Sequence, residues 1–168
     1  EAIRVNAEAV DGLFVAKQLA EVVKSGGYDL VLAGRESIDY NGGMVPGMLA
    51  ALVDFNFVNG CVGLEIDGTS VSLIREIDGG NETHSSTLPM VVAGQKGIVE
   101  ESDLRIPNMR GIMMARKKPL NVLEPKVLDN TTIVQSYEKP APKGAVKLVA
   151  ADNIDELINL LHNEAKVI

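Results

Sequence analysis

A short apolar run bounded by turn residues sets the strongest limit on what this chain can fold into. The run is apolar from Leu30 to Ala33 and is closed by Gly34, which is the pattern of a parallel strand buried on both faces. Residues 11–24 precede it with apolar side chains at helical spacing and end at a glycine pair, as helices do. A helix, a tight turn and a buried strand are half of a βαβ unit, so the sequence predicts an α/β fold.

In the middle of the chain, the spacing of the hydrophobic residues changes to one that is typical of strands. Strand-like residues 57–66 and 71–77 flank Asp67 and Gly68, a strong hairpin signal. A turn at residues 78–80 leads into a third strand over 81–87, so an antiparallel meander is expected. Further strands are expected over 2–5, 88–93 and 131–137, and further helices over 45–53, 108–118 and 153–165.

Composition excludes several classes of protein. The 168 residues include 46% hydrophobic and 23% charged residues, which is ordinary for a globular chain, and the net charge is −7. An acidic balance argues against a general nucleic-acid binder. The single cysteine, Cys61, cannot form an intrachain disulfide, and its apolar surroundings favour a small core residue. Without a signal peptide or an apolar run of about 20 residues, a soluble cytoplasmic protein with no membrane insertion is expected.

The loop between the strand at 29–33 and the helix at 45–53 is the first candidate binding site. Ligands of α/β sheets bind where strands end and lead into helices. Gly42 and Gly43 precede the helix, so bare backbone N–H groups there suit a phosphate. The motif is neither G-x-G-x-x-G nor a Walker A loop. A plain strand-to-helix turn that needs positive φ explains the glycines slightly better on spacing alone.

Several strings, taken together and in order, resemble the beta subunits of electron-transfer flavoproteins. Residues 29–39 resemble the family's "DLVLxGxxxxD" segment, residues 75–80 its hairpin, and residues 88–92 its next strand. Arg105 and residues 112–119 are similar to its "R…IMKAKKK" stretch. The similarity runs from near Asp11 to Ile168. It implies a mainly parallel, Rossmann-like sheet of the adenine-nucleotide hydrolase-like type, with flanking helices, an antiparallel meander and a C-terminal arm that ends in a helix.

The resemblance also implies two parts and a set of ligands. Residues 1–119 would form an α/β nucleotide-binding domain that is incomplete at its N-terminus, and residues 120–168 an extended arm with a helix. The family pairs with an alpha subunit that holds most of an FAD, while beta holds a structural AMP. The pair carries electrons from flavin dehydrogenases, such as acyl-CoA dehydrogenases, to a quinone reductase or similar acceptor oxidoreductase. The residues carried over to AMP, here called the glycine loop (residues 34–45), are Gly34, Arg35, Glu36, Ser37, Ile38, Asp39, Tyr40, Asn41, Gly42, Gly43, Met44 and Val45.

A second loop, residues 95–105, resembles the family's partner-recognition loop and is here called the docking loop. Counting from Leu88 puts its apolar anchor at Ile98, with Val99 beside it, whereas counting back from Arg105 puts it near Glu101. An apolar pair within a polar rim suits an interface; the alternative is that the pair packs under the loop. The residues carried over are Gln95, Lys96, Gly97, Ile98, Val99, Glu100, Glu101 and Arg105.

No catalytic or metal-binding set is predicted. His84 and His162 lack ligand partners at metal spacing, and no Ser-His-Asp set can be argued. The basic residues over 110–118 lack interleaved aromatics, which favours a solvated face or a subunit contact over nucleic acid. Two other classes remain open at this point: an AMP- or ATP-binding regulatory domain of the stress-protein type, and an adenine-nucleotide hydrolase or ligase.

Overall fold

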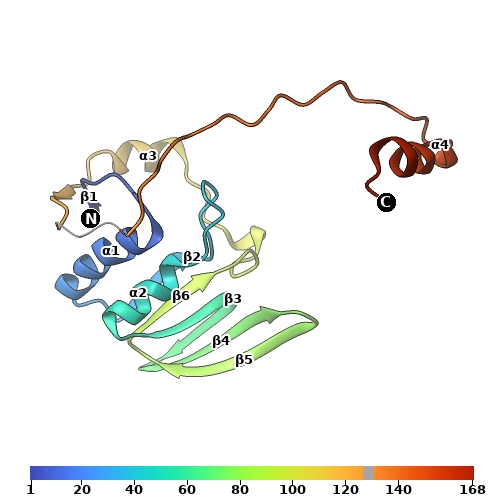
Figure 1. Ribbon diagram of the computed structural model, residues 1–168. Coiled ribbons are helices and arrows are strands. Elements are labelled where there is room, and N and C mark those ends of the chain that lie inside the picture. The colour runs from blue at the N-terminus through green and yellow to red at the C-terminus, as the bar shows by residue number, and fades with distance from the viewer. Residues whose placement is uncertain (127–130) are drawn as a thin grey trace. The chain divides into compact units, whose positions relative to one another are not determined.

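The computed structural model describes residues 1–126 and 131–168, which form two compact units, Glu1–Val134 and Gln135–Ile168. The first unit holds a five-stranded sheet in the order β2-β6-β3-β4-β5 and a separate two-stranded sheet of β1 and β7 (Figure 1). The strands are β1 (Ala2–Val5), β2 (Leu30–Gly34), β3 (Asn56–Asp67), β4 (Ser70–Ile77), β5 (Gly80–Thr87), β6 (Met90–Gly94) and β7 (Leu120–Leu123).

The five-stranded sheet is parallel on one side and antiparallel on the other. Strands β2, β6 and β3 run parallel, whereas β3, β4 and β5 form an antiparallel meander. The first half of β3 pairs with β6 and its second half with β4, and the register shifts around Cys61, beside Gly60 at φ 68°. Such bulges bend a strand. The α/β fold with a meander, predicted from the sequence, is confirmed.

Two helices cover the same part of the sheet. Helix α1 (Gly12–Gly26) begins at the cap residue Asp11, whose side chain accepts from the Phe14 N–H, and ends at Gly27 in the left-handed region. Helix α2 (Val45–Val53) follows the glycine loop. The two helices and β6 share one core cluster, made of Ala20, Val23, Leu49, Ala50 and Val91. A second cluster joins β3, β4 and β6 through Val58, Cys61, Val71, Leu73, Met90 and Val92.

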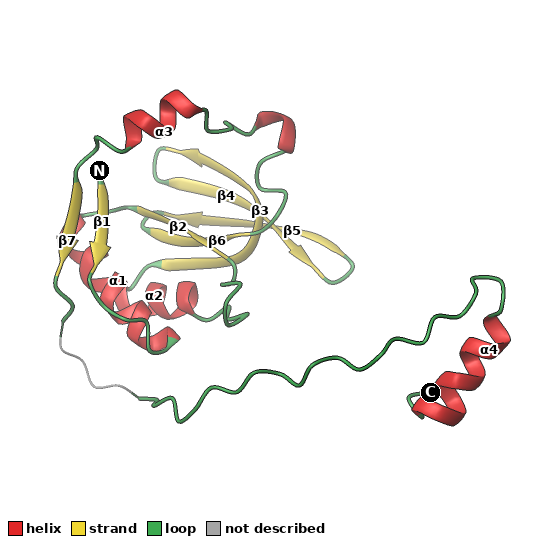
Figure 2. Ribbon diagram, turned by 90° about the horizontal axis from the view of Figure 1, so that it is seen from above, coloured by secondary structure: helices red, strands yellow, loops and turns green. Residues whose placement is uncertain are grey.

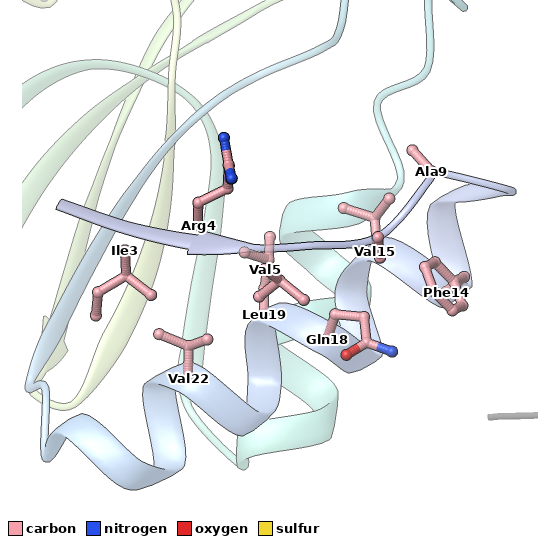
Figure 3. A pocket seen from close by; sticks show the side chains of 10 residues that line it. Ile3, Arg4, Val5, Ala9, Phe14, Val15, Gln18, Leu19 and Val22 are labelled. Atoms are coloured by element: carbon pink, nitrogen blue, oxygen red, sulfur yellow. The ribbon is translucent and has the colours of Figure 1, made fainter. Parts of the chain in front are cut away.

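The sheet of β1 and β7 lies apart from the larger sheet (Figure 2). Strand β1 lies along α1, where Ile3 and Val5 face Leu19 and Val22 across an apolar pocket of about 330 Å³, while Arg4 points away (Figure 3). A neighbouring pocket of about 350 Å³ separates β1 from β2. Within residues 1–126 and 131–168, strand β2 pairs with β6 alone, so its other edge is open. The expectation that this strand is buried on both faces is therefore wrong, because β2 is an edge strand and Leu32 is exposed.

The remaining helices of the first unit are short. Residues Glu101–Asp103 form a single 3-10 turn within the docking loop, and α3 (Met109–Ala115) is capped by Asn108. The helix predicted over 108–118 is therefore present but shorter. The strand predicted over 131–137 is wrong, because these residues form no strand. The hydroxyls of Thr131 and Thr132 instead donate to the Asp11 carboxylate, at 3.1 and 2.7 Å.

The second unit contains the C-terminal helix. The α-helical part, α4 (Ile154–Asn159), is capped by Asn153 and continues as a π-helical segment, Leu160–Ala165. Lys147 and Glu164 form an ion pair at 2.5 Å within this unit. The apolar stripe expected on the helix is present, and Ile154, Leu157 and Ile158 are exposed.

Candidate nucleotide site and docking loop

The glycine loop leaves β2 at its carboxyl end and closes on itself before α2 begins. The Ser37 N–H donates to the Gly42 carbonyl at 3.0 Å, in an isolated antiparallel bridge between the two residues. The tip between them carries Asn41 in the left-handed region, at φ 51°, which asparagine tolerates better than most residues. The loop is therefore a short, hydrogen-bonded turn that delivers Gly43 and Met44 to the start of α2.

The two glycines are not there to supply positive φ. The positive φ of the loop belongs to Asn41, and neither Gly42 nor Gly43 is in that region. Gly43 instead lies so close to the preceding strand that an added Cβ would be 3.4 Å from the Arg35 carbonyl oxygen. The alternative of a turn that needs glycine for its backbone angle is therefore wrong, and Gly43 is instead marked by its close approach to the Arg35 carbonyl.

The backbone N–H groups of Gly43 and Met44 have no acceptor in the described part of the chain. Met44 is the N-cap residue of α2, and its side chain makes no capping hydrogen bond. A helix start with open N–H groups carries a partial positive charge. This end of the loop can therefore accept an anion without giving up an internal hydrogen bond.

A pocket of about 270 Å³ opens beside these groups. Its wall is mostly apolar and comes from three elements: Val15 of α1, the end of β2, and the start of α2. The residues that line it are Val15, Ala33, Gly34, Glu36, Ser37, Gly42, Val45 and Pro46. An apolar wall next to anion-binding amides suits a ligand with a flat ring and a phosphate.

The start of α1 also reaches this site, which the sequence did not reveal. A Cβ on Gly12 would lie 2.9 Å from the Met44 side chain, so the first turns of α1 and α2 abut. Gly12 and Val15 lie before β2 in sequence, well apart from the glycine loop, and the packing of the two helices brings them to it. The signal that could have found them is the βαβ order itself, which places successive helix starts at one edge of the sheet.

Charged residues of the glycine loop are held by local partners. The pKa of Asp39 is lowered, first by the Ser37 hydroxyl and then by the Tyr40 N–H, both of which donate to its carboxylate. Arg35 and Glu36 form a loose ion pair at 4.0 Å. Ile38, Asp39 and Tyr40 form the exposed tip of the loop and do not line the pocket. The structure thus gathers only part of the predicted nucleotide set around the pocket.

The docking loop begins next to the glycine loop, because β2 and β6 are neighbours and Gly34 pairs with Gly94. Ile98 is half-buried and packs against the cluster of β3, β4 and β6. Val99 is 49% exposed. Glu100, Glu101 and Arg105 are exposed around it. The docking loop therefore exposes Val99 within a charged rim, while Ile98 packs beneath the loop.

His84 belongs to a small cluster of charged side chains on the meander. His84 Nε2 lies 2.8 Å from Glu82 Oε1, which also pairs with Arg75 at 3.0 Å. This hydrogen bond to His84 is the largest cause of the lowered pKa of Glu82. Residues 1–126 and 131–168 contain no group of three or more His, Cys, Asp or Glu side chains placed to hold a metal ion. No helix within the same residues is long and apolar enough to span a bilayer.

Comparison with known proteins identifies the family of the chain. Residues 1–128 match the family model "Electron transfer flavoprotein domain". The electron transfer flavoprotein subunit beta of Bacillus subtilis is 36% identical over 94% of this chain and 64% of its own length. The beta subunit of Bradyrhizobium diazoefficiens is 31% identical over 99% and 67%, and that of Homo sapiens 29% identical over 88% and 59%. The chain spans less than two thirds of the first relatives it matches.

These matches confirm the resemblance to beta subunits and leave the stress-protein and hydrolase alternatives without support. Strand β2, the glycine loop and the docking loop lie within the matched residues 1–128. Their geometry shows open amides beside an apolar pocket and an adjacent exposed loop. The chain belongs to the electron transfer flavoprotein family, among its beta subunits.

Proposed function

We propose that this chain is the nucleotide-holding and docking part of an electron carrier. Together with an FAD-bearing alpha subunit, it passes electrons from flavin dehydrogenases, such as acyl-CoA dehydrogenases, to a quinone reductase or a similar acceptor. The FAD, held mainly by the alpha subunit, supplies the redox chemistry. The beta chain supplies an AMP site at the glycine loop and a contact surface at the docking loop, and needs no catalytic side chain of its own.

The observation that carries the AMP site is the pair of open N–H groups at Gly43 and Met44, next to the 270 Å³ pocket. These amides fit the phosphate of AMP, and the apolar wall fits its adenine or ribose. Burying a phosphate costs less where amide donors and a helix start already point at it. A strongly anionic triphosphate is disfavoured beside Glu36, which lines the same pocket.

Binding of AMP to the full-length protein tests this site. In Gly43→Ala, the new methyl group would lie 3.4 Å from the Arg35 carbonyl oxygen, at the limit of ordinary contact, and directly beside the amides that would hold the phosphate. We expect calorimetry to show AMP binding weakened about tenfold or more, the equivalent of about 1.4 kcal/mol. Gly144→Ala is the matched control, since a Cβ there would meet nothing within 4 Å. Equal AMP affinity in both variants contradicts the site.

The docking loop is tested separately, through the rate of electron transfer from the dehydrogenase. Transient carriers bind through small contacts and release quickly, which suits one apolar side chain in a polar rim. We expect both Val99→Ala and Ile98→Ala to slow the transfer while the flavin content of the heterodimer stays unchanged. Val99 acts by direct contact, because it is the exposed member of the pair, and Ile98 by holding the loop from below. An unaltered rate in both variants removes this loop from the docking role.

A further inference from the structure

The roots of the glycine loop and the docking loop are tied to each other. The parallel ladder of β2 and β6 ends at the pair Gly34 and Gly94. Beyond it, the Arg35 N–H donates to the Gly94 carbonyl at 3.1 Å, and the Gln95 N–H donates to the Cys61 carbonyl at 2.9 Å. Arg35 and Gln95 therefore leave the sheet side by side, each held by one more backbone hydrogen bond.

The Gln95 side chain then connects the docking loop to the glycine loop through its amide oxygen and to β4 through its amide nitrogen. Arg35 Nη1 donates to Gln95 Oε1 at 2.6 Å, and Gln95 Nε2 donates to the Glu76 carboxylate of β4. Hydrogen bonds with one charged partner are stronger than neutral ones, and here the amide lies between a cation and an anion. The carbonyl of Gln95 also accepts from the Ile98 N–H at 3.3 Å, so the same residue shapes the turn of the docking loop.

Arg35 connects this chain of contacts to the phosphate-binding end of the glycine loop. Gly43 packs against the Arg35 carbonyl, because a Cβ there would be only 3.4 Å away. Gly43 therefore lies next to the residue whose guanidinium is held by Gln95. A continuous series of contacts thus joins Gly43 to Arg35 and Arg35 to Gln95. From Gln95 the contacts continue to Glu76 and to Ile98.

From this arrangement we infer that Gln95 is a positioning residue, which couples nucleotide binding in the glycine loop to the order of the docking loop. The inference rests on the proposed nucleotide site. The side chain of Arg35 is about half exposed, so water competes for its hydrogen bond to Gln95 and this contact opens and closes in the free protein. A bound phosphate fixes the backbone at Gly43 and Arg35. The Arg35 to Gln95 contact then forms at a smaller loss of entropy, and the docking loop is ordered.

Hydrogen exchange of the full-length protein, with and without saturating AMP, measures this coupling. We expect AMP to slow amide exchange in peptides over residues 95–105 by about fivefold or more, the lower range of common coupling factors. In Gln95→Leu, which keeps the size of the side chain and removes its polar atoms, AMP still binds in calorimetry but the slowing is lost. Gln95→Asn, too short to reach both partners, gives the same loss with a polar side chain.

Two further variants separate coupling from a general effect on the loop. Ser102 lies in the same loop, and its hydroxyl donates to its neighbour Asp103, so Ser102→Ala keeps the full AMP response. Arg35→Met breaks the contact from its other end, and the double variant with Gln95→Leu loses no more of the response than either single variant.

The outcomes distinguish the coupling from the nucleotide site itself. AMP binding by the wild-type protein without a change in exchange over 95–105 overturns the coupling and leaves the site standing. A response in Gln95→Leu and Gln95→Asn equal to that of the wild type removes Gln95 from the positioning role. A wild-type protein that does not bind AMP at all overturns both the coupling and the proposed site.

Discussion

Gln18 and Lys126, which lie far apart in sequence, hold each other through two reciprocal hydrogen bonds. Gln18 Nε2 donates to the Lys126 carbonyl at 2.8 Å, and the Lys126 N–H donates to Gln18 Oε1 at 3.0 Å. Lys126 Nζ also pairs with Glu21 on the same helix. The side-chain amide of Gln18 thus pairs with both backbone groups of Lys126, as a neighbouring strand would, and holds the segment after β7 against α1.

Replacement of this glutamine should destabilise the first unit. Gln18 is only 5% exposed, so Gln18→Ala leaves two backbone groups of Lys126 without their partners in a partly buried place. We expect a loss of about 1–3 kcal/mol in the free energy of unfolding, measured in urea. Ser25→Ala is the control, because its exposed hydroxyl bonds only within the last turn of α1. A loss as small as that of the control would show that water replaces both bonds.

Asp11 gives the protein a pH-dependent contribution to stability. Its pKa is lowered, first by the Phe14 N–H that it caps and then by the Thr132 hydroxyl. A lowered pKa in the folded state means that the contribution is present above the ordinary pKa of 3.8 and is lost as the pH falls through the folded value. Asp11→Ala should therefore be less stable than the wild type at pH 7, and this difference should shrink in strong acid.

Thermal unfolding at a series of pH values measures that difference. Asp152→Ala removes one charge at an exposed position and serves as the control, with little change at any pH. The difference in Tm between Asp11→Ala and the wild type could instead stay constant down to the most acidic pH. That result would mean that the hydroxyl and amide donors do not stabilise the charged carboxylate.

The core cluster of β3, β4 and β6 predicts a large loss of stability for one residue of β4 and a small change for its neighbour. Leu73 is fully buried in the cluster, whereas Ile74 points to the other face and is exposed. Leu73→Ala should lower the free energy of unfolding by about 2–5 kcal/mol, because it opens a cavity. Ile74→Ala should change it by no more than about 1 kcal/mol. If denaturant unfolding shows similar losses of stability for both variants, the assignment of Leu73 to the buried face of the meander and of Ile74 to its exposed face is wrong.

The open edge of β2 predicts self-association of this chain by itself. In the part of the chain that the structure describes, the strand is bonded to β6 alone, and Leu32 is 64% exposed. Unpaired apolar edges attract other strands. We expect sedimentation to show concentration-dependent oligomers, and Leu32→Lys to shift the chain toward monomer. Leu148→Lys, on an exposed residue of the second unit, should leave the oligomers unchanged. A purely monomeric wild-type chain contradicts the prediction.

Much of the fold could be predicted because its signals are local. The helix of residues 12–26 has its cap and its terminal glycine in the sequence, and the hairpin after Asp67 has Gly68, at φ 60°, where the turn needs it. Cys61, predicted to be a core residue, is fully buried. The family could be predicted as well, because several short strings occur in the right order along the chain.

The tertiary structure alone decided how these pieces meet. The pairing of β1 with β7, the approach of Gly12 to Met44, and the contact between Arg35 and Gln95 each join residues far apart in sequence. The expected strand over 131–137 failed for the same reason, since the partner that Thr131 and Thr132 found was the distant Asp11. Capping and turn preferences act between near neighbours, so a sequence displays them. Contacts between distant segments depend on which strands lie side by side, and the sheet order settles that.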